Sequence, residues 1–413
     1  MFKKYKNESG QAIVLIAIAI VGLIGFTALA IDGGNAFSDR RKAQNAADTA
    51  AFSAALARVR NNPSWQTVGQ NIATSNGFND NGTSNTVNLY NPPIEGPYAG
   101  NSEYVQVIIV SHVDTFFGPV VGVDQVTNRV DAVARSKPSV EMFFGNAMVS
   151  LGMENDPQPV CEFNGSAGGS ITGGGVFCNS SSNCAFDVDG TAGSISVPEG
   201  VTTVGTACDI ADAGLSSSDV TSGADQLAMP DFSWLDDLCT DTTTYSDATH
   251  RSGNTINPPS ATTPLYFGSS FPPNHVEVLS PGIYCLDNTF RLTAAGDTLS
   301  GTDVTIVMLS GALTWNGGTI NLAAPTSGDY AGLLLYQPLS NSSTMSMSGG
   351  VTLDTVGTVL APSALISLSG GAHTVVNGQL IGEEIDFTGS TGTSINYSDP
   401  DNINFPPQIE LTN

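Results

Sequence analysis

Positive charge is scarce in this 413-residue chain and is concentrated in its first part. Thirteen Lys and Arg stand against 38 Asp and Glu, which gives a formal net charge of −25. Eight of the thirteen fall within residues 1–60, and Arg291 is the only one from residue 252 onward. A body this acidic repels phosphate backbones and anionic lipid. Nucleic acid is therefore excluded as a partner.

Cysteine is absent from the first 160 residues. The six cysteines that follow have no zinc-motif spacing and the four histidines are scattered, so a Cys/His metal site is not expected. An even number in a Gly- and Ser-rich acidic segment predicts disulfides outside the cytoplasm. Six cysteines allow 15 pairings and the sequence does not choose among them, although Cys178 and Cys184 are close enough for a short loop. The disulfide candidates are Cys161, Cys178, Cys184, Cys208, Cys239 and Cys285.

Catalytic motifs are missing as well. The chain has no Walker lysine motif, no G-x-S-x-G and no H-E-x-x-H. The nearest approach to a carboxylate pair is Glu383 with Glu384 or Asp386. Glu384 and Asp386 would share one face of a strand, about 7 Å apart, a spacing compatible with glycoside hydrolysis. Solvated acids on an outer face are the simpler interpretation, so we expect no enzymatic activity and predict no catalytic residue.

No cofactor or metal site is predicted either. Asp187 and Asp189 resemble the head of a calcium loop, but the twelfth position is Pro198, where such a loop needs a bidentate Glu. A turn is the preferred interpretation there, and also for residues 399–402 (Asp-Pro-Asp-Asn). Calcium binding by acidic loops stays open as an alternative.

Charge is also absent from residues 9–31, and this stretch organises the chain. It holds 23 residues between Glu8 and Asp32. As a helix it reaches roughly 34 Å, enough to cross a hydrocarbon core of about 30 Å. Lys3, Lys4 and Lys6 precede it and favour a cytoplasmic N-terminus. Cleavage after the Ala28-Leu29-Ala30 sequence is the less favoured alternative, because the apolar run is longer than a signal peptide needs.

The same helix is predicted to continue beyond Asp32, since the next proline is Pro63. An alanine face recurs along this second half at spacings of four and three residues. Such a face suits either close packing of another copy's helix or packing on the chain's own domain, and the sequence leaves both open. Gln44 and Asp48 lie at i and i+4 and are expected to pair. The predicted packing face is Ala43, Ala47, Ala50, Ala54 and Ala57.

This N-terminal region resembles the Tad (Flp-pilus, tight-adherence) family, in particular its TadG-like members. Those proteins carry a Gly-rooted apolar run, an Asp-x-Gly exit and a Gln-Asn-Ala-Ala-Asp helix. The matching residues here are Gly10, Asp32, Gly33, Gln44, Asn45 and Asp48. The resemblance implies a pilin-related protein anchored in the bacterial envelope that helps to assemble or present adhesive pili.

Four segments are predicted: a basic lead and long helix (1–60), a small α+β domain packed on that helix (61–138), a Gly/Ser-rich Cys-containing β region (139–275) and β-solenoid repeats (276–413). In the second segment, strands are expected over Tyr104–Val113 and Val126–Ser136, with a short helix between them. In the last, Ser/Thr-Gly punctuation separated by 21 and 19 residues favours a right-handed parallel β-helix. A β-sandwich is the alternative.

Together these features predict a single-pass envelope protein whose acidic body lies outside the cytoplasm and has a structural or adhesive role. Its expected partners are the membrane, copies of itself or other pilus proteins through the helix, and a surface or polysaccharide ligand. Two alternatives are kept. One is the main subunit of a filament with this helix in its core, and the other is a surface β-helix enzyme acting on carbohydrate.

Overall fold

The computed structural model describes residues 9–153, 160–189, 195–348, 350–369, 373–389 and 392–412. The predicted basic lead, Lys3, Lys4 and Lys6, lies outside these residues. The chain forms two compact units, one of residues 1–140 with 406–413 and the other of residues 141–405. In sequence, the second unit is therefore an insertion into the first.

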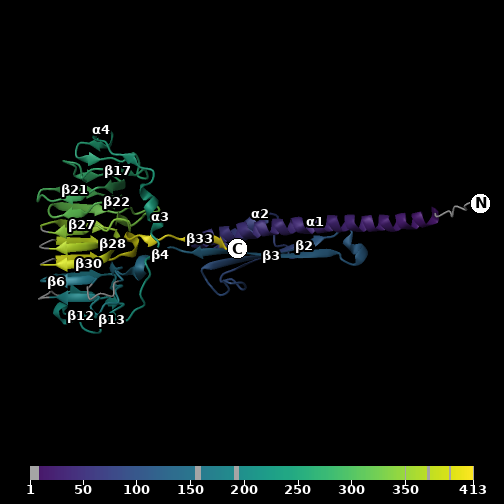
Figure 1. Ribbon diagram of the computed structural model, residues 1–413, viewed down its shortest axis with the longest axis horizontal. Helices are drawn as coiled ribbons and strands as arrows, with labels where there is room; N and C mark the ends of the chain where they lie inside the picture. The colour runs from purple at the N-terminus through teal and green to yellow at the C-terminus, as the bar shows by residue number, and fades with distance from the viewer. Residues whose placement is uncertain are drawn as a thin grey trace, which may run out of the picture. The chain divides into compact units, whose positions relative to one another are not determined.

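The first unit is built on one long helix, α1 (Ser9–Val59). A second helix, α2 (Trp65–Ser75), packs against it, and an antiparallel sheet of order β1-β2-β3-β33 runs beside it (Figure 1). The predicted long helix and both predicted strands are confirmed. The strands of this sheet are β1 (Asn85–Tyr90), β2 (Tyr104–Asp114), β3 (Gln125–Lys137) and β33 (Gln408–Thr412).

The connection between β2 and β3 differs from its prediction. The sequence Thr-Phe-Phe-Gly-Pro-Val-Val-Gly suggested a short helix, but only a single 3-10 turn, η1 (Gly118–Val121), forms. Pro119 and the left-handed Gly122, with a φ of 84°, close the turn after four residues. The helix-like pattern of this stretch therefore gives an outward-facing loop at the tip of a hairpin.

The regular secondary structure of the second unit is mostly β-strand. Among the described residues they form a 17-stranded and a 10-stranded sheet. The strands of the larger sheet are β5 (Met148–Ser150), β6 (Cys161–Asn164), β8 (Val176–Cys178), β9 (Phe186–Asp189), β11 (Val201–Thr203), β12 (Ala207–Cys208), β13 (Val220–Ser222), β14 (Thr243–Thr244), β17 (Leu265–Phe267), β19 (Gly282–Asp287), β20 (Phe290–Leu292), β22 (Val304–Ser310), β23 (Leu313–Trp315), β25 (Leu333–Tyr336), β26 (Met345–Ser348), β28 (Thr358–Ser369) and β30 (Leu380–Thr388). Those of the smaller sheet are β7 (Gly168–Thr172), β10 (Ile195–Ser196), β15 (Arg251–Ser252), β16 (Thr255–Ile256), β18 (Val278–Leu279), β21 (Thr298–Gly301), β24 (Thr319–Ala323), β27 (Thr352–Val356), β29 (His373–Asn377) and β31 (Gly392–Asn396).

These strands stack in parallel, coil upon coil. Val359 faces Leu380 and Ile366 faces Ile385 on the next coil, offsets of 21 and 19 residues, in agreement with the predicted repeat. The β-sandwich alternative is wrong, because its sheets would be antiparallel, whereas the described pairs here are parallel except β15 with β16. Residues such as Trp315 and Ile385 fill the interior between the two sheets.

The order of the coils is not the order of the sequence. β5 and β6, at the start of this unit, pair with β30, near its end, so the chain enters in the middle of the stack. It builds coils outward through β8 and β11 to β13. It then crosses to the opposite end, starts again at β14 and β17, and returns coil by coil to β30 (Figure 1). Predicted segments 139–275 and 276–413 are therefore not separate domains, because their strands share one sheet.

The crossing segment covers one outer face of the stack. It carries the short helices α3 (Ser233–Asp236) and η4 (Asp237–Cys239), so residues 227–238 are a packed crossing with a helical turn. Phe232, Leu235 and Leu238 are buried against strand residues such as Tyr336. The apolar face of the sheet explains why this segment is ordered against it. The remaining short elements are β4 (Val140–Glu141) with β32 (Asn404–Phe405), α4 (Asp247–His250), η2 (Met142–Gly145), η3 (Ile210–Ala213) and η5 (Asp399–Asp401).

Strand β33 gives a second correction to the predicted domains. It pairs antiparallel with β3, from Val133–Thr412 to Lys137–Gln408, although it comes at the end of the chain. Ile409 packs on the core between α1 and the sheet. The last residues thus complete the sheet of the first unit instead of extending the solenoid, and the predicted 276–413 domain ends too late.

Candidate functional site

The N-terminal half of α1 is an apolar rod with no covering side chains. Its large residues are exposed, from 76% for Phe26 to 42% for Ile31. Of the helices that the structure describes, this is the one long and apolar enough to cross a membrane. In water this surface would be costly, at about 25 cal/mol per Å² of apolar area, so a nonpolar environment is required around it. Gly10 lies in this part of the helix.

The predicted alanine face lies in the second half and is used within the first unit. Ala43, Ala47, Ala50 and Ala54 are fully buried and Ala57 is 7% exposed. Their partners include residues of β2, β3 and α2. Small side chains let α2 come very close, since a Cβ on Gly69 would lie 3.1 Å from the Ala54 Cβ. The sequence left open whether the alanine face packs on another copy's helix or on the chain's own domain. In the structure it packs on the chain's own domain.

Asp32, at the end of the apolar run, holds the loop between β2 and β3. Its Oδ1 accepts a hydrogen bond from the Phe116 N–H at 2.8 Å. Its Oδ2 accepts from the N–H groups of Phe117 and Gly118 at 3.0 and 2.8 Å. A carboxylate satisfying three backbone donors is a strong, oriented contact. The family-motif Asp32 therefore fixes the hairpin tip to the helix, while the neighbouring Gly33 is exposed.

Further polar contacts continue along the helix. Asn128 Nδ2 donates to the Ala36 carbonyl and to Asp39 Oδ2, at 3.0 and 2.9 Å. Gln44 Nε2 donates to Asp48 Oδ1 at 2.8 Å, the expected local pair, and to the backbone carbonyl of Asp131 at 3.1 Å. The family residue Gln44 thus joins α1 to the sheet, and Asp48 accepts a hydrogen bond from the same side-chain amide. Asn45 is exposed.

The first half of α1 is long and apolar enough to cross a membrane, and its second half is packed on a small sheet. This arrangement is typical of a protein anchored by an N-terminal helix. The family model described as "Putative Flp pilus-assembly TadE/G-like" matches residues 10–57, which is this helix from Gly10 almost to its end. The resemblance to the Tad family is thereby confirmed for the N-terminal region, which carries a TadE/G-like segment, and an envelope location fits this match and the apolar helix. Comparison with curated protein sequences gives no match.

A second candidate site is a column of carboxylates on the outer face of the solenoid. Asp386, Glu162 and Asp187 lie opposite one another on adjacent strands, about 4.8 Å apart. Burial raises the pKa of Glu162; the hydrogen bond from Asn164 lowers it, and neighbouring charges raise it again. Burial and the charge of Asp209 raise the pKa of Asp187. The prediction of a turn at Asp187 and Asp189 is wrong, because both residues lie in strand β9.

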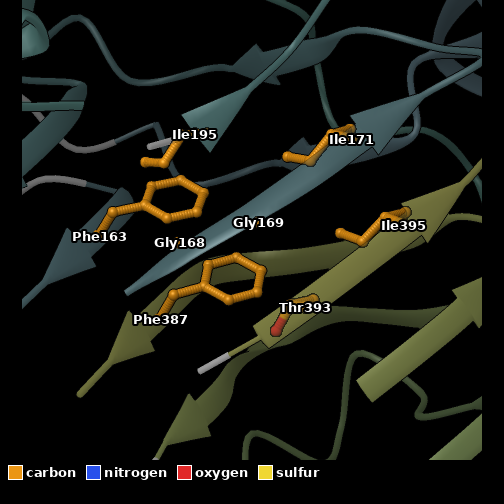
Figure 2. A pocket seen from close by; sticks show the side chains of 8 residues that line it. All are labelled: Phe163, Gly168, Gly169, Ile171, Ile195, Phe387, Thr393 and Ile395. Atoms are coloured by element: carbon orange, nitrogen blue, oxygen red, sulfur yellow. The ribbon is translucent and has the colours of Figure 1, made fainter. Parts of the chain in front are cut away.

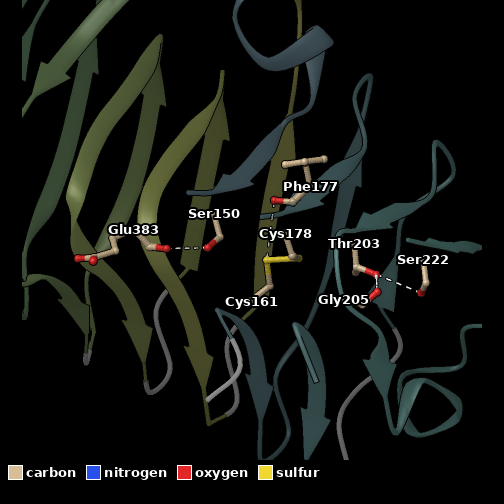
Figure 3. Close-up of a disulfide and its surroundings, with 8 residues drawn as sticks. All are labelled: Ser150, Cys161, Phe177, Cys178, Thr203, Gly205, Ser222 and Glu383. Atoms are coloured by element: carbon tan, nitrogen blue, oxygen red, sulfur yellow. Dashed lines mark hydrogen bonds between the residues drawn. A yellow bond between two sulfur atoms is a disulfide. The ribbon is translucent and has the colours of Figure 1, made fainter. Parts of the chain in front are cut away.

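The predicted carboxylate pair is placed on the same outer face. Glu384 and Asp386 flank the buried Ile385 and are half-buried, while Glu383 is exposed. The Glu383 carbonyl accepts a hydrogen bond from Ser150 Oγ at 2.6 Å, and its carboxylate points away from Ser150 (Figure 3). The structure thus brings Glu384 and Asp386 to one strand face, as predicted, on a sheet surface.

All six predicted cysteines are paired, as Cys161–Cys178, Cys184–Cys208 and Cys239–Cys285. The suggested short loop closed by Cys178 and Cys184 is wrong, because Cys178 is bonded to Cys161 and Cys184 to Cys208. The first bridge joins β6 to β8, which lie on adjacent coils of the stack but are not paired with each other (Figure 3). Asp187 lies near the sulfurs of Cys184 and Cys208, but their disulfide leaves neither thiolate free to bind a metal.

The interior of the solenoid offers little room near this column. One cavity, of about 10 Å³, lies between β6, β7, β30 and β31 (Figure 2). The stacked rings of Phe163 and Phe387, 4.6 Å apart, form one wall, and Ile171, Ile195 and Ile395 contribute to the rest. A space of this size is at the lower limit for one water molecule. It is a packing defect of the core and not a ligand site.

Two groups of residues were missed by sequence reasoning. Asp39 lies seven residues after Asp32, a spacing that places both on one helix face. This spacing could have indicated that both carboxylates bind the β2–β3 hairpin. The carboxylate column was signalled by the similar sequences Cys-Glu-Phe-Asn and Ile-Asp-Phe-Thr, which begin at Cys161 and Ile385. Aligning these two segments would have placed Glu162 beside Asp386.

Proposed function

We propose that this protein is an envelope-anchored component of a Tad-type pilus or filament system with a structural, adhesive role. In this proposal α1 crosses the cytoplasmic membrane and the acidic solenoid lies outside the cytoplasm. The observation that carries the proposal is the single helix that is apolar and exposed over its first half and matches the Tad model over residues 10–57. Three disulfides support an oxidising location for the body.

Thiol labelling of intact cells tests this topology. All native cysteines are paired, so an introduced cysteine is the one reactive thiol. A membrane-impermeant maleimide should label Ser340→Cys, which is exposed on the solenoid, and should spare Lys6→Cys until the cells are opened. Labelling of Lys6→Cys but not Ser340→Cys in intact cells would refute the proposed orientation.

A filament subunit is the second candidate, and the glycines of α1 favour it. Gly22, Gly25, Gly33 and Gly34 each cost a helix about 0.8–1 kcal/mol relative to alanine. A Cβ at any of them would meet nothing within 4 Å in this chain. Open positions of this kind allow a neighbouring helix to approach closely, as in a filament core. Electron microscopy of native protein separates the candidates, since long polymers indicate a subunit and detergent-bound particles an anchored accessory protein.

We further propose that the solenoid binds surfaces or polysaccharides without turning them over. Proton transfer needs groups with tuned pKa values within reach of one substrate. Here Glu384 and Asp386 lie on a sheet face, and Arg251 and Arg291 are the only Lys or Arg within residues 141–405. A panel of neutral and acidic polysaccharides should remain intact with the purified protein. Degradation that Glu384→Gln abolishes would establish the enzymatic alternative.

A further inference from the structure

The loop joining β2 to β3 presents an unusual exposed apolar surface. Its nine residues, Thr115–Val123, contain no charge and are bounded by Asp114 and Asp124. Val120 and Val121 are 87% and 79% exposed. We define the hairpin tip as its five exposed apolar residues, which are Phe116, Phe117, Val120, Val121 and Val123. A cluster of five such side chains at one tip indicates an interaction surface.

The position of the hairpin tip is set by Asp32. This residue directly follows Ile31, the end of the apolar run, and its carboxylate binds the backbone of residues 116–118. The tip therefore lies beside α1, at the end of its apolar run (Figure 1). Its exposed apolar side chains are therefore held next to the residue at which the apolar half of α1 ends. The exposed cations Arg40, Arg41 and Lys42 follow within about 15 Å along the helix.

The backbone of the loop is also prepared for an apolar environment. Groups placed near hydrocarbon need internal hydrogen bonds, because water is not available to them. Besides the three N–H groups bound by Asp32, those of Val120 and Gly122 bond to Phe117 and Pro119 carbonyls. The N–H of Val123 bonds to the Gly118 carbonyl at 2.9 Å. Polar donors are thus directed inward while the Phe and Val side chains face outward.

We propose that the hairpin tip inserts into the lipid interface beside the membrane-spanning helix and gives the first unit a second membrane contact. Asp32 is its positioning residue. Lipid is favoured over a protein partner because Asp32 holds the tip at the end of the apolar run of α1, where charge reappears in the sequence. Phe and Val at this depth suit the boundary between headgroups and acyl chains. This inference rests on the proposed membrane anchoring.

The test uses full-length protein reconstituted in phosphatidylcholine vesicles. An environment-sensitive fluorophore on Val120→Cys reports the surroundings of the hairpin tip. The matched control is Thr67→Cys. Thr67 is exposed on α2, which packs on α1 about 27 Å beyond Asp32. We expect blue-shifted emission from position 120, quenched by half or more when the vesicles contain lipids with a nitroxide near the headgroup. Position 67 should emit as in water, and adding Asp32→Ala should return position 120 toward that emission.

Each other outcome counts against a specific step. Protein that does not float with the vesicles refutes the proposed anchoring itself. Protein that floats while the label at position 120 stays in water refutes only the insertion of the tip. Blue-shifted emission that lipid nitroxides do not quench indicates burial against protein, such as a second copy, and also refutes lipid insertion.

Discussion

Replacement of Ala50 by leucine tests how α1 is used in the first unit. Ala50 is fully buried, and its carbonyl oxygen would lie 3.3 Å from a Cβ placed on Gly69 of α2. The leucine adds three carbons where two helices already touch. Overpacking of this kind typically costs about 1–3 kcal/mol. A loss of 1 kcal/mol lowers the melting temperature of a domain near 100 residues by roughly 4 °C, so the melting temperature of the first unit should fall by about 4–12 °C.

The matched control is Thr49→Leu. Thr49 is the adjacent residue, is exposed, and its hydroxyl bonds only within the helix and to Asn76. This change introduces the same side chain outside the packed face, so the melting temperature should move little. Thermal unfolding in detergent, followed by circular dichroism at the helix band, measures both variants. Hydrogen exchange of β2 and β3 should rise in Ala50→Leu alone, with exchange in residues 141–405 unchanged.

The expected result distinguishes internal packing from an assembly seam. If Ala50→Leu unfolds like Thr49→Leu, then the alanine face is not tightly packed on the sheet and the structural argument fails. If stability is retained while assembly or anchoring is lost, the face serves another copy of the chain instead.

Three further predictions concern the rest of the fold. Deleting residues 406–413 removes β33 from β3 and should destabilise the first unit by roughly 2–4 kcal/mol, at about 0.5–1.5 kcal/mol per hydrogen bond, while exchange in the solenoid stays the same. The disulfide Cys239–Cys285 ties the crossing segment to strand β19 and closes a loop with a sequence separation of 46 residues. Replacing both cysteines by alanine should lower the unfolding free energy of the second unit by about 4 kcal/mol, measured by chemical unfolding. An unchanged unfolding midpoint would show that this disulfide does not stabilise the second unit. Glu162 has a raised pKa in the fold, so its ionisation destabilises the native state as pH rises above its ordinary value of 4.5; Glu162→Gln should therefore raise the melting temperature at pH 7 and have no such effect at pH 3.5.

The local elements were largely predictable because their signals are local. The 23-residue uncharged run, the β-branched strand at Tyr104 and the repeat of about 20 residues each specify structure through composition and period. Three disulfides followed from an even cysteine count. Their pairing did not, since Cys161 meets Cys178 only because β6 and β8 lie on neighbouring coils.

The order of the coils could not be predicted from the same signals. Coils of a solenoid present nearly equivalent edges, so β30 offers similar pairing to any parallel strand of matching pattern. That it meets β5 depends on the crossing segment, whose Phe232 and Leu235 pack on the outer face. The partner of β33 was equally hidden, because a five-residue strand carries no mark of the sheet it joins.

Only part of the candidate site could be predicted, because its contacts also join residues that are far apart in the sequence. The alanine face was visible in the sequence, but small residues suit a neighbouring copy and the chain's own sheet equally well. The role of Asp32 depends on contacts with residues 116–118, more than eighty positions away. A helix-like pattern in that loop then concealed its exposed tip, since Pro119 and Gly122 limit it to one 3-10 turn.

The charge of the protein divides as sharply as its fold. Residues 141–405 hold 27 of the 38 Asp and Glu but two of the 13 Lys and Arg, so the whole net charge of −25 belongs to the second unit. The first unit is neutral, with eleven residues of each sign. A neutral unit with an apolar helix can approach a membrane without electrostatic cost, whereas the solenoid is repelled by anionic lipid and by other copies of itself. In the proposed topology, anchoring and surface exposure are carried by different units. Because the repulsion is screened by salt, contacts between solenoids should strengthen as ionic strength rises.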